Sequence, residues 1–362
     1  MRGLFRRPRA TGITGLLALL ATLSPVLAAR QSGSAAPSDR GVAVENLEVK
    51  SLHVQGRVWM LVAGPYNAAA QIGDDGVLVV DTMAAGLADK MIAEIRRLAG
   101  SKPIRYVVNT HVHADHTGGN EKVAGAGRSI VAGNVAGDVG PNAANSAAII
   151  AHENVLNRMS AADGQGLAPF KARPTDTFFN DEKDLYFNGE GIELLHVPAA
   201  HTDGDVMVYF RGSDVIVTGD LFMTTTFPVV DAKAGGDIKG ILDGLNRIID
   251  ITIPRDKQEG GTYVIPGHGR LADEADVVDY RDMVTVLRDR IEDAIEKRLT
   301  IEQVKAAGVA GDYDGRYGAK GGAGTSDQFV EAVYRSLEGS RRRSTSKAPT
   351  TVKPAAAPGA RK

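Results

Sequence analysis

The sequence of 362 residues predicts an α/β layered domain in which helices cover the faces of β-sheets. Three observations lead to this prediction. Short apolar runs recur along the chain and end in turns that contain Gly or Asp, which is typical of strands. Segments with apolar residues every three or four positions alternate with these runs and indicate amphipathic helices. The composition, 43% hydrophobic and 24% charged, is ordinary for a soluble globular protein with a sizeable core.

The elements follow one another in a regular order. Residues 58–82 predict two or three short strands, and residues 86–100 predict a helix that a glycine ends. Residues 104–110 predict a buried strand that runs straight into a group of histidines. Further along, the pattern predicts a helix at 145–162, three strands within 192–222, a helix at 237–251, a strand and loop at 261–269 and a long amphipathic helix at 274–299.

The two ends of the chain differ from this body. Residues 1–28 have a basic start, an apolar run and small residues near their end, which predicts a secretory signal peptide and a periplasmic or secreted protein. An uncleaved anchor is the alternative, but the apolar run is short for a membrane span. Residues 29–44 predict a flexible lead-in. Residues 341–362, with seven basic residues and no acid, predict a disordered basic tail, either solvated or tethered to an acidic surface.

Charge and cysteine content narrow the possible functions. Loss of the signal peptide removes four arginines and lowers the formal net charge from −2 to −6, and without the basic tail the body carries −13. Such a body should repel nucleic acid, which is bound by basic surfaces. The chain has no cysteine, so export brings no disulfides and metal ligation by thiolate is excluded.

The stretch THVHADHTGG, residues 110–119, gathers three of the chain's eight histidines around one aspartate. Three other apolar runs also end in a metal-ligand type: LLHVPAA leads to His201, VIVT to Asp220 and YVIP to His268. Loops at strand ends commonly carry the chemistry of a layered fold. Imidazole and carboxylate groups without thiolate suit Zn²⁺, and also Fe or Mn.

The spacing of these residues suggests two groups of ligands. Two histidines that lie two residues apart in an extended segment lean the same way, and a third from a later loop would complete a site with an open fourth position. A second group forms where the chain turns past that pair. A bridging carboxylate could place one oxygen on each of two cations, about 3.5–4 Å apart. The first group is His111, His113 and His201, the second is Asp115, His116 and His268, and the bridge is Asp220.

Taken together, the pattern H-x-H-x-D-H, a later His, a Gly-Asp and a final Gly-His resembles the metallo-β-lactamase superfamily over about residues 45–300. GVLVVDT is similar to the early strand of that superfamily, and HTDGDVMVYF, VTGDLF and IPGHG are similar to its later motifs. The resemblance implies a four-layer αββα sandwich, with residues 45–340 as one hydrolase-like domain that ends in C-terminal helices. It also implies a dinuclear metal site on one edge, with Asp81 supporting the metal loop from behind.

The resemblance further implies hydrolysis by a metal-bound hydroxide, because ligation lowers the pKa of water to near 7. Asp115 would be the catalytic carboxylate that orients the nucleophile. Two Zn²⁺ per chain are expected, with Fe or Mn as other possibilities. The substrate would be a small molecule with an ester, lactone, thioester or lactam carbonyl. β-Lactamase activity does not follow from the name of the superfamily, because one fold carries many chemistries.

The chain departs from some branches of that superfamily. Subclass B1 and B2 lactamases use a cysteine where Asp220 stands, and an aspartate there is more similar to glyoxalase II, lactonases and phosphodiesterases. One alternative is a mononuclear iron enzyme that oxidises a sulfur compound, similar to persulfide dioxygenases. Another is a protein that holds metal only structurally, but structural zinc sites are closed. Neither nucleic acid nor stable membrane insertion after signal cleavage is expected, and the sequence leaves the oligomeric state open.

Other polar and aromatic residues receive structural interpretations first. His196 lies inside a predicted strand and by alternation faces away from the histidine that follows it, which favours a structural role. His152 falls in a predicted helix as a surface or lid residue. The loop 224–237 either walls the pocket or is an ordinary surface loop. Trp59 and Tyr66 are core residues by default, with a substrate-facing role as the alternative.

Overall fold

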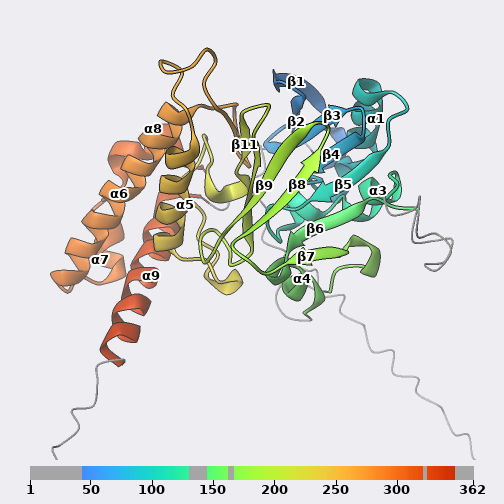
Figure 1. The fold of residues 1–362 in the computed structure, drawn as a ribbon. Coiled ribbons are helices and arrows are strands. Elements are labelled where there is room, and N and C mark those ends of the chain that lie inside the picture. The colour runs from blue at the N-terminus through green and yellow to red at the C-terminus, as the bar shows by residue number, and fades with distance from the viewer. Residues whose placement is uncertain (1–42, 130–144, 162–166, 321–323, 347–362) are drawn as a thin grey trace, which may run out of the picture. The chain divides into compact units, whose positions relative to one another are not determined.

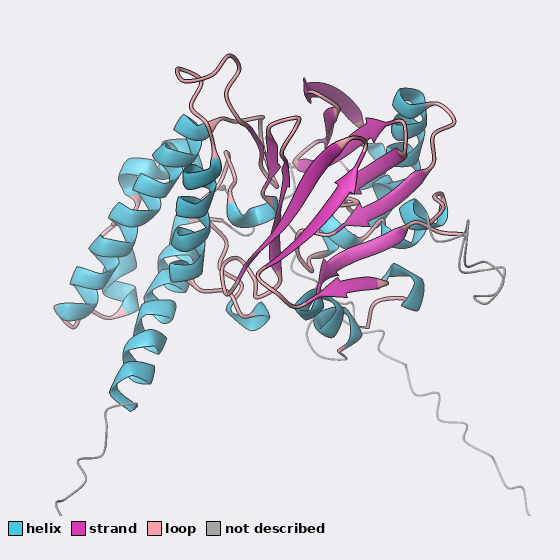
Figure 2. Ribbon diagram, in the orientation of Figure 1, coloured by secondary structure: helices cyan, strands magenta, loops and turns pink. Residues whose placement is uncertain are grey.

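The computed structural model describes residues 43–129, 145–161, 167–320 and 324–346. The predicted signal peptide, nearly all of the lead-in and residues 347–362 of the predicted tail lie outside the described residues. Within the described part, two β-sheets lie face to face and helices cover their outer sides (Figures 1 and 2).

The first sheet has seven strands that follow one another in chain order. They are β1 (Lys50–Gln55), β2 (Val58–Ala63), β3 (Tyr66–Gly73), β4 (Gly76–Val80), β5 (Ile104–Val108), β6 (Ala148–His152) and β7 (Asp176–Phe178). The pairs from β1 to β4 are antiparallel and the pairs from β4 to β7 are parallel. Parallel pairing of β4 with β5 requires a crossover, and helix α1 (Ala88–Ala99) supplies it. The carboxyl ends of these two strands therefore meet at one edge of the sheet.

The second sheet has five strands in the order β12-β11-β10-β9-β8. They are β8 (Glu182–Phe187), β9 (Glu190–Val197), β10 (Asp205–Phe210), β11 (Val215–Val217) and β12 (Tyr263–Ile265). Only β11 and β12 pair in parallel, and helix α5 (Ile238–Ile251) connects them. β8 and β9 form a hairpin through Asn188 and Gly189, whose φ angles of 53° and 80° are those that an Asn-Gly turn favours.

Of the remaining helices that the structure describes, two are long and the other five are short. They are α2 (Ala114–Thr117), α3 (Asn120–Gly125), α4 (Glu153–Ser160), α6 (Glu274–Glu296), α7 (Ile301–Ala306), α8 (Asp314–Tyr317) and α9 (Ser326–Ser346). Short 3₁₀ turns lie at Val44–Asn46, Ala85–Leu87, Phe170–Ala172, Gly219–Leu221, Ala232–Ala234 and Gly311–Tyr313. A capping box of Asp273 and Asp276 begins α6, because each side chain accepts a backbone N–H of the other. Among the described residues, none of the helices combines the length and the apolar character that a membrane crossing needs.

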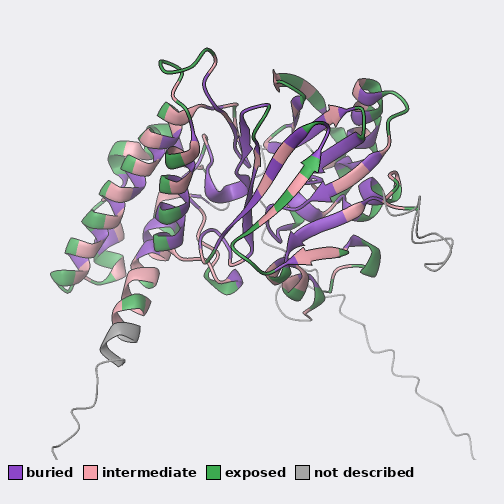
Figure 3. Cartoon of the chain, viewed as in Figure 1, coloured by how far each residue is buried: buried purple, intermediate pink, exposed green. Residues whose placement is uncertain are grey.

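Three apolar layers separate four layers of secondary structure, which confirms the predicted αββα sandwich (Figure 3). The layer between the two sheets contains buried residues of both, such as Leu78, Val108, Phe210 and Val217. The outer face of the seven-stranded sheet packs on α1 and α3 through residues such as Val79, Met91 and Val123. The outer face of the five-stranded sheet packs on α5, α6 and α9 through residues such as Met207, Leu245, Leu287 and Val333.

Two predicted boundaries differ from the structure. The segment 145–162 was predicted as a helix, but its first half is strand β6 and only Glu153–Ser160 is helical. The run of small and apolar residues before Glu153 lies buried beside β5, where a strand satisfies the backbone hydrogen bonds. The basic tail was predicted to begin at residue 341, but α9 continues to Ser346. Arg341, the first residue of the predicted tail, lies 3.5 Å from Glu292 and 3.1 Å from Glu296 of α6.

Candidate metal centre

Loops from both sheets converge at one edge of the sandwich. Strand β5 leads into the histidine stretch 110–119, and β9, β11 and β12 lead to His201, Asp220 and His268. Two backbone contacts connect the sheets here: Val206 N donates to Thr110 O, and the start of β3 forms a bridge with His268. Side chains that are distant in the sequence are thereby brought together.

The turn after β4 fixes the histidine stretch from behind. Asp81 has a left-handed backbone conformation with φ of 62°, which aspartate tolerates better than most residues. Its carboxylate accepts hydrogen bonds from Thr110 N at 2.8 Å and from Thr110 Oγ1 at 2.7 Å. The carboxylate oxygen that accepts from Thr110 Oγ1 is Oδ2, and it also lies 2.7 Å from His116 Nδ1. The resemblance implied that Asp81 supports this loop, and the structure places it accordingly.

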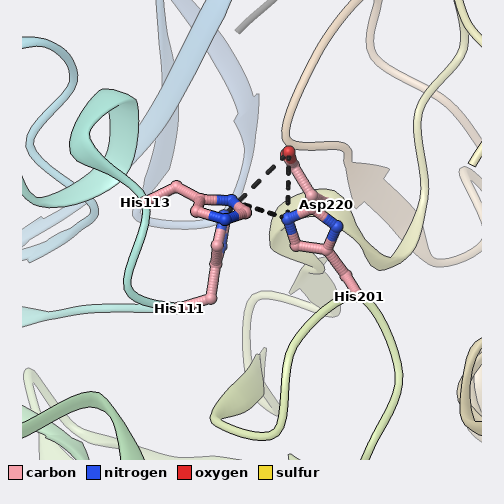
Figure 4. A group of neighbouring side chains, drawn as sticks. All are labelled: His111, His113, His201 and Asp220. Atoms are coloured by element: carbon pink, nitrogen blue, oxygen red, sulfur yellow. Dashed lines mark hydrogen bonds and ion pairs between the residues drawn. The ribbon is translucent and has the colours of Figure 1, made fainter. Parts of the chain in front are cut away.

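The first group consists of His111, His113, His201 and Asp220 (Figure 4). His113 Nδ1 lies 2.9 Å from His201 Nε2, and Asp220 Oδ2 lies 3.7 Å from His201 Nε2 and 4.0 Å from His111 Nε2. All four residues are buried. Their ligand-type atoms point toward one another, as Figure 4 shows, and lie within 4.8 Å of one another.

The second group consists of Asp115, His116 and His268, and it shares Asp220 with the first group. Asp220 Oδ1 lies 3.2 Å from His116 Nε2 and 3.3 Å from His268 Nε2. Asp115 Oδ2 lies 3.6 Å and 3.3 Å from the same two nitrogens. One oxygen of Asp220 therefore faces each group, which is the arrangement that a bridging carboxylate requires. Gly267 permits this approach, because a Cβ there would collide with Asp220 Oδ1.

Buried polar atoms without a hydrogen-bonding partner gather at this centre. Six such side-chain atoms occur among the described residues, and five belong to the two groups: His111 Nε2, Asp115 Oδ2, His116 Nε2, Asp220 Oδ1 and His268 Nε2. Buried polar atoms are nearly always satisfied in folded proteins, because leaving them unpaired costs free energy. Imidazole nitrogens and carboxylate oxygens that converge in this way fit divalent cations such as zinc.

The other ring nitrogen of each histidine has an outer partner. His111 Nδ1 lies 3.1 Å from Thr110 Oγ1, His201 Nδ1 lies 2.6 Å from Val229 O, and His268 Nδ1 lies 2.7 Å from Pro65 O. The two remaining histidines each contact a carboxylate: His116 contacts Asp81 and His113 contacts Asp231. Outer partners of this kind fix the tautomer and the orientation of a metal-binding histidine.

Electrostatics distinguish the two groups. Burial and neighbouring imidazoles lower the pKa of His111, and burial together with His113 lowers the pKa of His201 to about 4. In the second group, burial alone would lower the pKa of His116, but three carboxylates outweigh it and raise that pKa. Burial would also lower the pKa of His268, but Asp220 and Asp115 together outweigh it and raise that pKa to about 10. Burial would raise the pKa of Asp220, but His268 and His116 lower it, so the carboxylate stays ionised.

All seven residues predicted as ligands thus lie in the two groups, in the predicted division. Outside them, His196 Nε2 lies 2.9 Å from Asp203 O, and its ring stacks on His152 at a centroid distance of 3.6 Å. His152 is buried at the end of β6, so its prediction as a surface or lid residue in a helix is wrong. Tyr66 is buried with its ring 6.2 Å from that of His268, whereas Trp59 packs on His53.

One contact of this centre was missing from the sequence prediction. Asp231 lies in the loop 224–237, which was predicted only as a pocket wall or a surface loop, and its Oδ2 lies 3.0 Å from His113 Nε2. The two residues are 118 positions apart. No local spacing pattern relates them, so the sequence carried no signal for this contact.

Comparison with known proteins gives a consistent result. A family model described as the metallo-beta-lactamase superfamily matches residues 61–272. The chain is 27% identical over 179 residues to the 2,4-dinitroanisole O-demethylase subunit alpha of Nocardioides sp., covering 49% of this chain and 48% of that protein. It is also 27% identical over 265 residues to a linear primary-alkylsulfatase of Pseudomonas sp., covering 64% of this chain and 48% of that protein. The chain therefore spans about half the length of these curated relatives.

A solved structure shares the fold. The stereoselective inverting sec-alkylsulfatase from Pseudomonas sp. is similar with a TM-score of 0.59 at 18% sequence identity. The similarity covers 79% of this chain and 50% of that protein. At this identity the likeness concerns the arrangement of the layers.

Proposed function

The chain belongs to the metallo-β-lactamase superfamily, and from this premise we propose that it is an exported hydrolase that binds two zinc ions. Its substrate would be a small molecule with an ester, lactone, thioester or lactam carbonyl. The observation that carries the proposal is the convergence of buried, unpartnered donor atoms on two groups that share Asp220.

The residues present define where the cations would be held. Bound divalent cations would supply water that is activated at neutral pH and would polarise the reacting carbonyl. Asp220, through its two oxygens, would contribute to both sites. One cation would be held by His111, His113, His201 and Asp220, and the other by Asp115, His116, His268 and Asp220.

Asp115 is the residue that we assign to proton handling. Its side chain lies in the first turn of α2 and is 11% exposed, while that of Asp220 is 8% exposed and those of His116 and His268 are 1% and 2% exposed. Burial would raise its pKa, but His116 and His268 lower it, so the carboxylate is ionised at neutral pH. An ionised carboxylate at this position can orient an attacking water and accept its proton.

A sulfate ester is a second candidate substrate class. The similarity to a linear primary-alkylsulfatase over 64% of this chain favours it. A centre of this kind can activate water against a sulfur atom as well as against a carbonyl carbon, because the activation of water does not depend on the electrophile. A substrate panel should therefore contain carboxylic esters, lactones, thioesters, β-lactams and alkyl sulfates.

Elemental analysis of the purified protein tests the metal proposal. We expect about two zinc ions per chain, because each group offers at least three protein donors, the usual number at a catalytic zinc site. His116→Ala should lower the zinc content to about one per chain, because it removes a donor of the second group only. His53→Ala is the matched control, since this histidine contacts Gly56 O and Trp59 and lies outside both groups.

The iron alternative gives a different result in the same measurement. About one iron per chain, with no zinc, would contradict the dizinc proposal and favour oxidation of a sulfur compound. Oxygen consumption with persulfide substrates would then replace the hydrolysis panel. Metal content below about half an ion per chain in zinc-supplemented preparations would contradict both.

Export is a separate part of the proposal and rests on the N-terminal sequence. The basic start and the apolar run support cleavage after Ala28 or Ala29. We expect the protein in the periplasmic or secreted fraction of its producing cell, with a mass that begins at residue 29 or 30. A full-length mass in the cytoplasmic fraction would contradict export and leave the metal proposal unaffected.

A further inference from the structure

The ring nitrogens that face away from the donor atoms contact different partners in the two groups. In the first group, His113 faces the other donors with Nδ1, so its Nε2 points outward and lies 3.0 Å from Asp231 Oδ2. In the second group, His116 faces the donors with Nε2, and its Nδ1 contacts Asp81. Asp81 also reaches the first group, because it binds Thr110, whose hydroxyl contacts His111. Each group therefore has one histidine that contacts a carboxylate.

Asp231 is itself held firmly in place. Its Oδ1 accepts hydrogen bonds from Lys233 N and Ala234 N, both at 3.0 Å, and so caps the 3₁₀ turn Ala232–Ala234. Its backbone N–H donates to His201 O at 3.0 Å, and its backbone oxygen accepts from Gly236 N at 2.8 Å. One carboxylate oxygen is thus used to hold the side chain, and the other remains for His113.

The same short segment orients a second histidine of the first group. Val229 O lies 2.6 Å from His201 Nδ1, two residues before Asp231. Residues 229–231, which we call the 229–231 segment, therefore contact the outer nitrogens of two of the three histidines in the first group. The outer nitrogens of the second group contact Asp81 and Pro65 O instead.

We propose that the 229–231 segment selectively sets the metal affinity of the first group, with Asp231 as the positioning residue for His113. The inference rests on the proposed function, because it requires a metal ion on these histidines. A carboxylate that accepts the Nε2–H of an imidazole fixes the tautomer, holds the ring orientation and makes the opposite nitrogen a better ligand. Loss of this partner weakens metal binding where His113 is a ligand and leaves the second group intact.

The test measures zinc affinity by competition with a chromophoric chelator in full-length chains that keep one group each. His268→Ala removes a second-group donor and leaves the first group, and His111→Ala does the reverse. Adding Asp231→Ala should lower zinc affinity about 10–100-fold in the His268→Ala chain and less than about threefold in the His111→Ala chain. A separate measurement uses the zinc-loaded protein that keeps both groups. There, the Asp231→Ala substitution alone should abolish the NMR signal of the His113 Nε2–H.

Two further variants separate positioning from a general effect on the loop. Asp231→Asn keeps one oxygen for the cap but places an amide NH2, which cannot accept the Nε2–H, against His113, so its affinity loss should approach that of Asp231→Ala while the loop stays capped. Asp237→Ala removes the cap of α5, six residues further on, and should leave zinc affinity unchanged in both backgrounds.

The outcomes distinguish this inference from the proposed function. An equal affinity loss in the two backgrounds, or no loss in either, would overturn the selective role of the segment. So would a failure of both single-group chains to bind zinc while the unsubstituted chain binds it, because the groups would then not be independent. If the unsubstituted chain binds no zinc, the proposed function itself fails.

Discussion

Asp220→Ala is expected to remove most of the metal and nearly all of the hydrolytic activity, a larger effect than the loss of a donor that faces only one group. Asp220 is the residue whose oxygens face both groups, with Oδ2 at 3.7 Å from His201 Nε2 and Oδ1 at 3.2 Å from His116 Nε2. Loss of an outer partner typically costs 10–100-fold, and loss of a ligand shared by two cations should cost more, about 10³-fold or greater in kcat/KM. Zinc content by elemental analysis should fall below one per chain.

Asp220→Asn is the matched variant, because it keeps the volume and one oxygen. An amide nitrogen is not a ligand for zinc, so one group should retain its donor and the other should lose it. We expect a zinc content near one per chain and an activity between that of the unsubstituted protein and that of Asp220→Ala. Thermal unfolding of the metal-free proteins checks that the fold survives. Asp220→Ala with unchanged zinc content and activity would contradict the bridging role.

The second large effect is a pH dependence that separates the two groups. In the apoprotein, the pKa of His116 is raised and that of His268 is raised to about 10. Both rings are therefore cationic at pH 7, with a proton on each ring nitrogen. A metal ligand must be deprotonated, so a cation has to displace these protons. Release of about one to two protons makes the second-group affinity rise on the order of 10–100-fold per pH unit between about pH 6.5 and the folded pKa values.

The first group behaves differently because its pKa shifts have the opposite sign. Burial lowers the pKa of His111 and of His201, the latter to about 4, so these rings are neutral above about pH 6. A cation binds there without displacing their protons, and affinity above that pH should be nearly flat. With free zinc buffered at one fixed concentration, we therefore expect one ion per chain at pH 6.5 and two at pH 8.5.

Calorimetry in two buffers with different enthalpies of ionisation measures the released protons directly. The second binding step should release about one to two protons near pH 7, and His116→Gln, which removes a donor of the second group, should abolish this step together with its protons. The His53→Ala protein should release as many protons as the unsubstituted chain. Release of fewer than about half a proton in the second step would contradict the assignment of protonated histidines to the second group.

Much of the fold and of the candidate centre could be predicted from local patterns. The helices at 88–99, 238–251 and 274–296 carry apolar residues on one face, and the strands at 104–108 and 263–265 are short apolar runs that end in polar loops. The grouping of His111 and His113 apart from Asp115 and His116 followed from the change between an extended segment and a turn. Local patterns predict less where small apolar residues suit both a helix and a strand, as in the segment that forms β6.

Strand β8 ends in a turn that has a clear sequence signal. Its alternation of exposed and less exposed residues ends at Asn188-Gly189, a dipeptide that strongly favours a two-residue hairpin. The prediction for the second sheet began only at residue 192, because the charged residues of this edge strand hid its pattern. Edge strands often carry such charges, which oppose pairing with another chain.

The sequence by itself determined the layered fold class, the types of ligand and their division into two groups, because these depend on residue type and on spacing over a few positions. The tertiary structure decided which outer partner each histidine has and that Asp231 reaches His113. These contacts join residues up to about 200 positions apart. They arise from the packing of two sheets against each other, which no periodicity along the chain encodes.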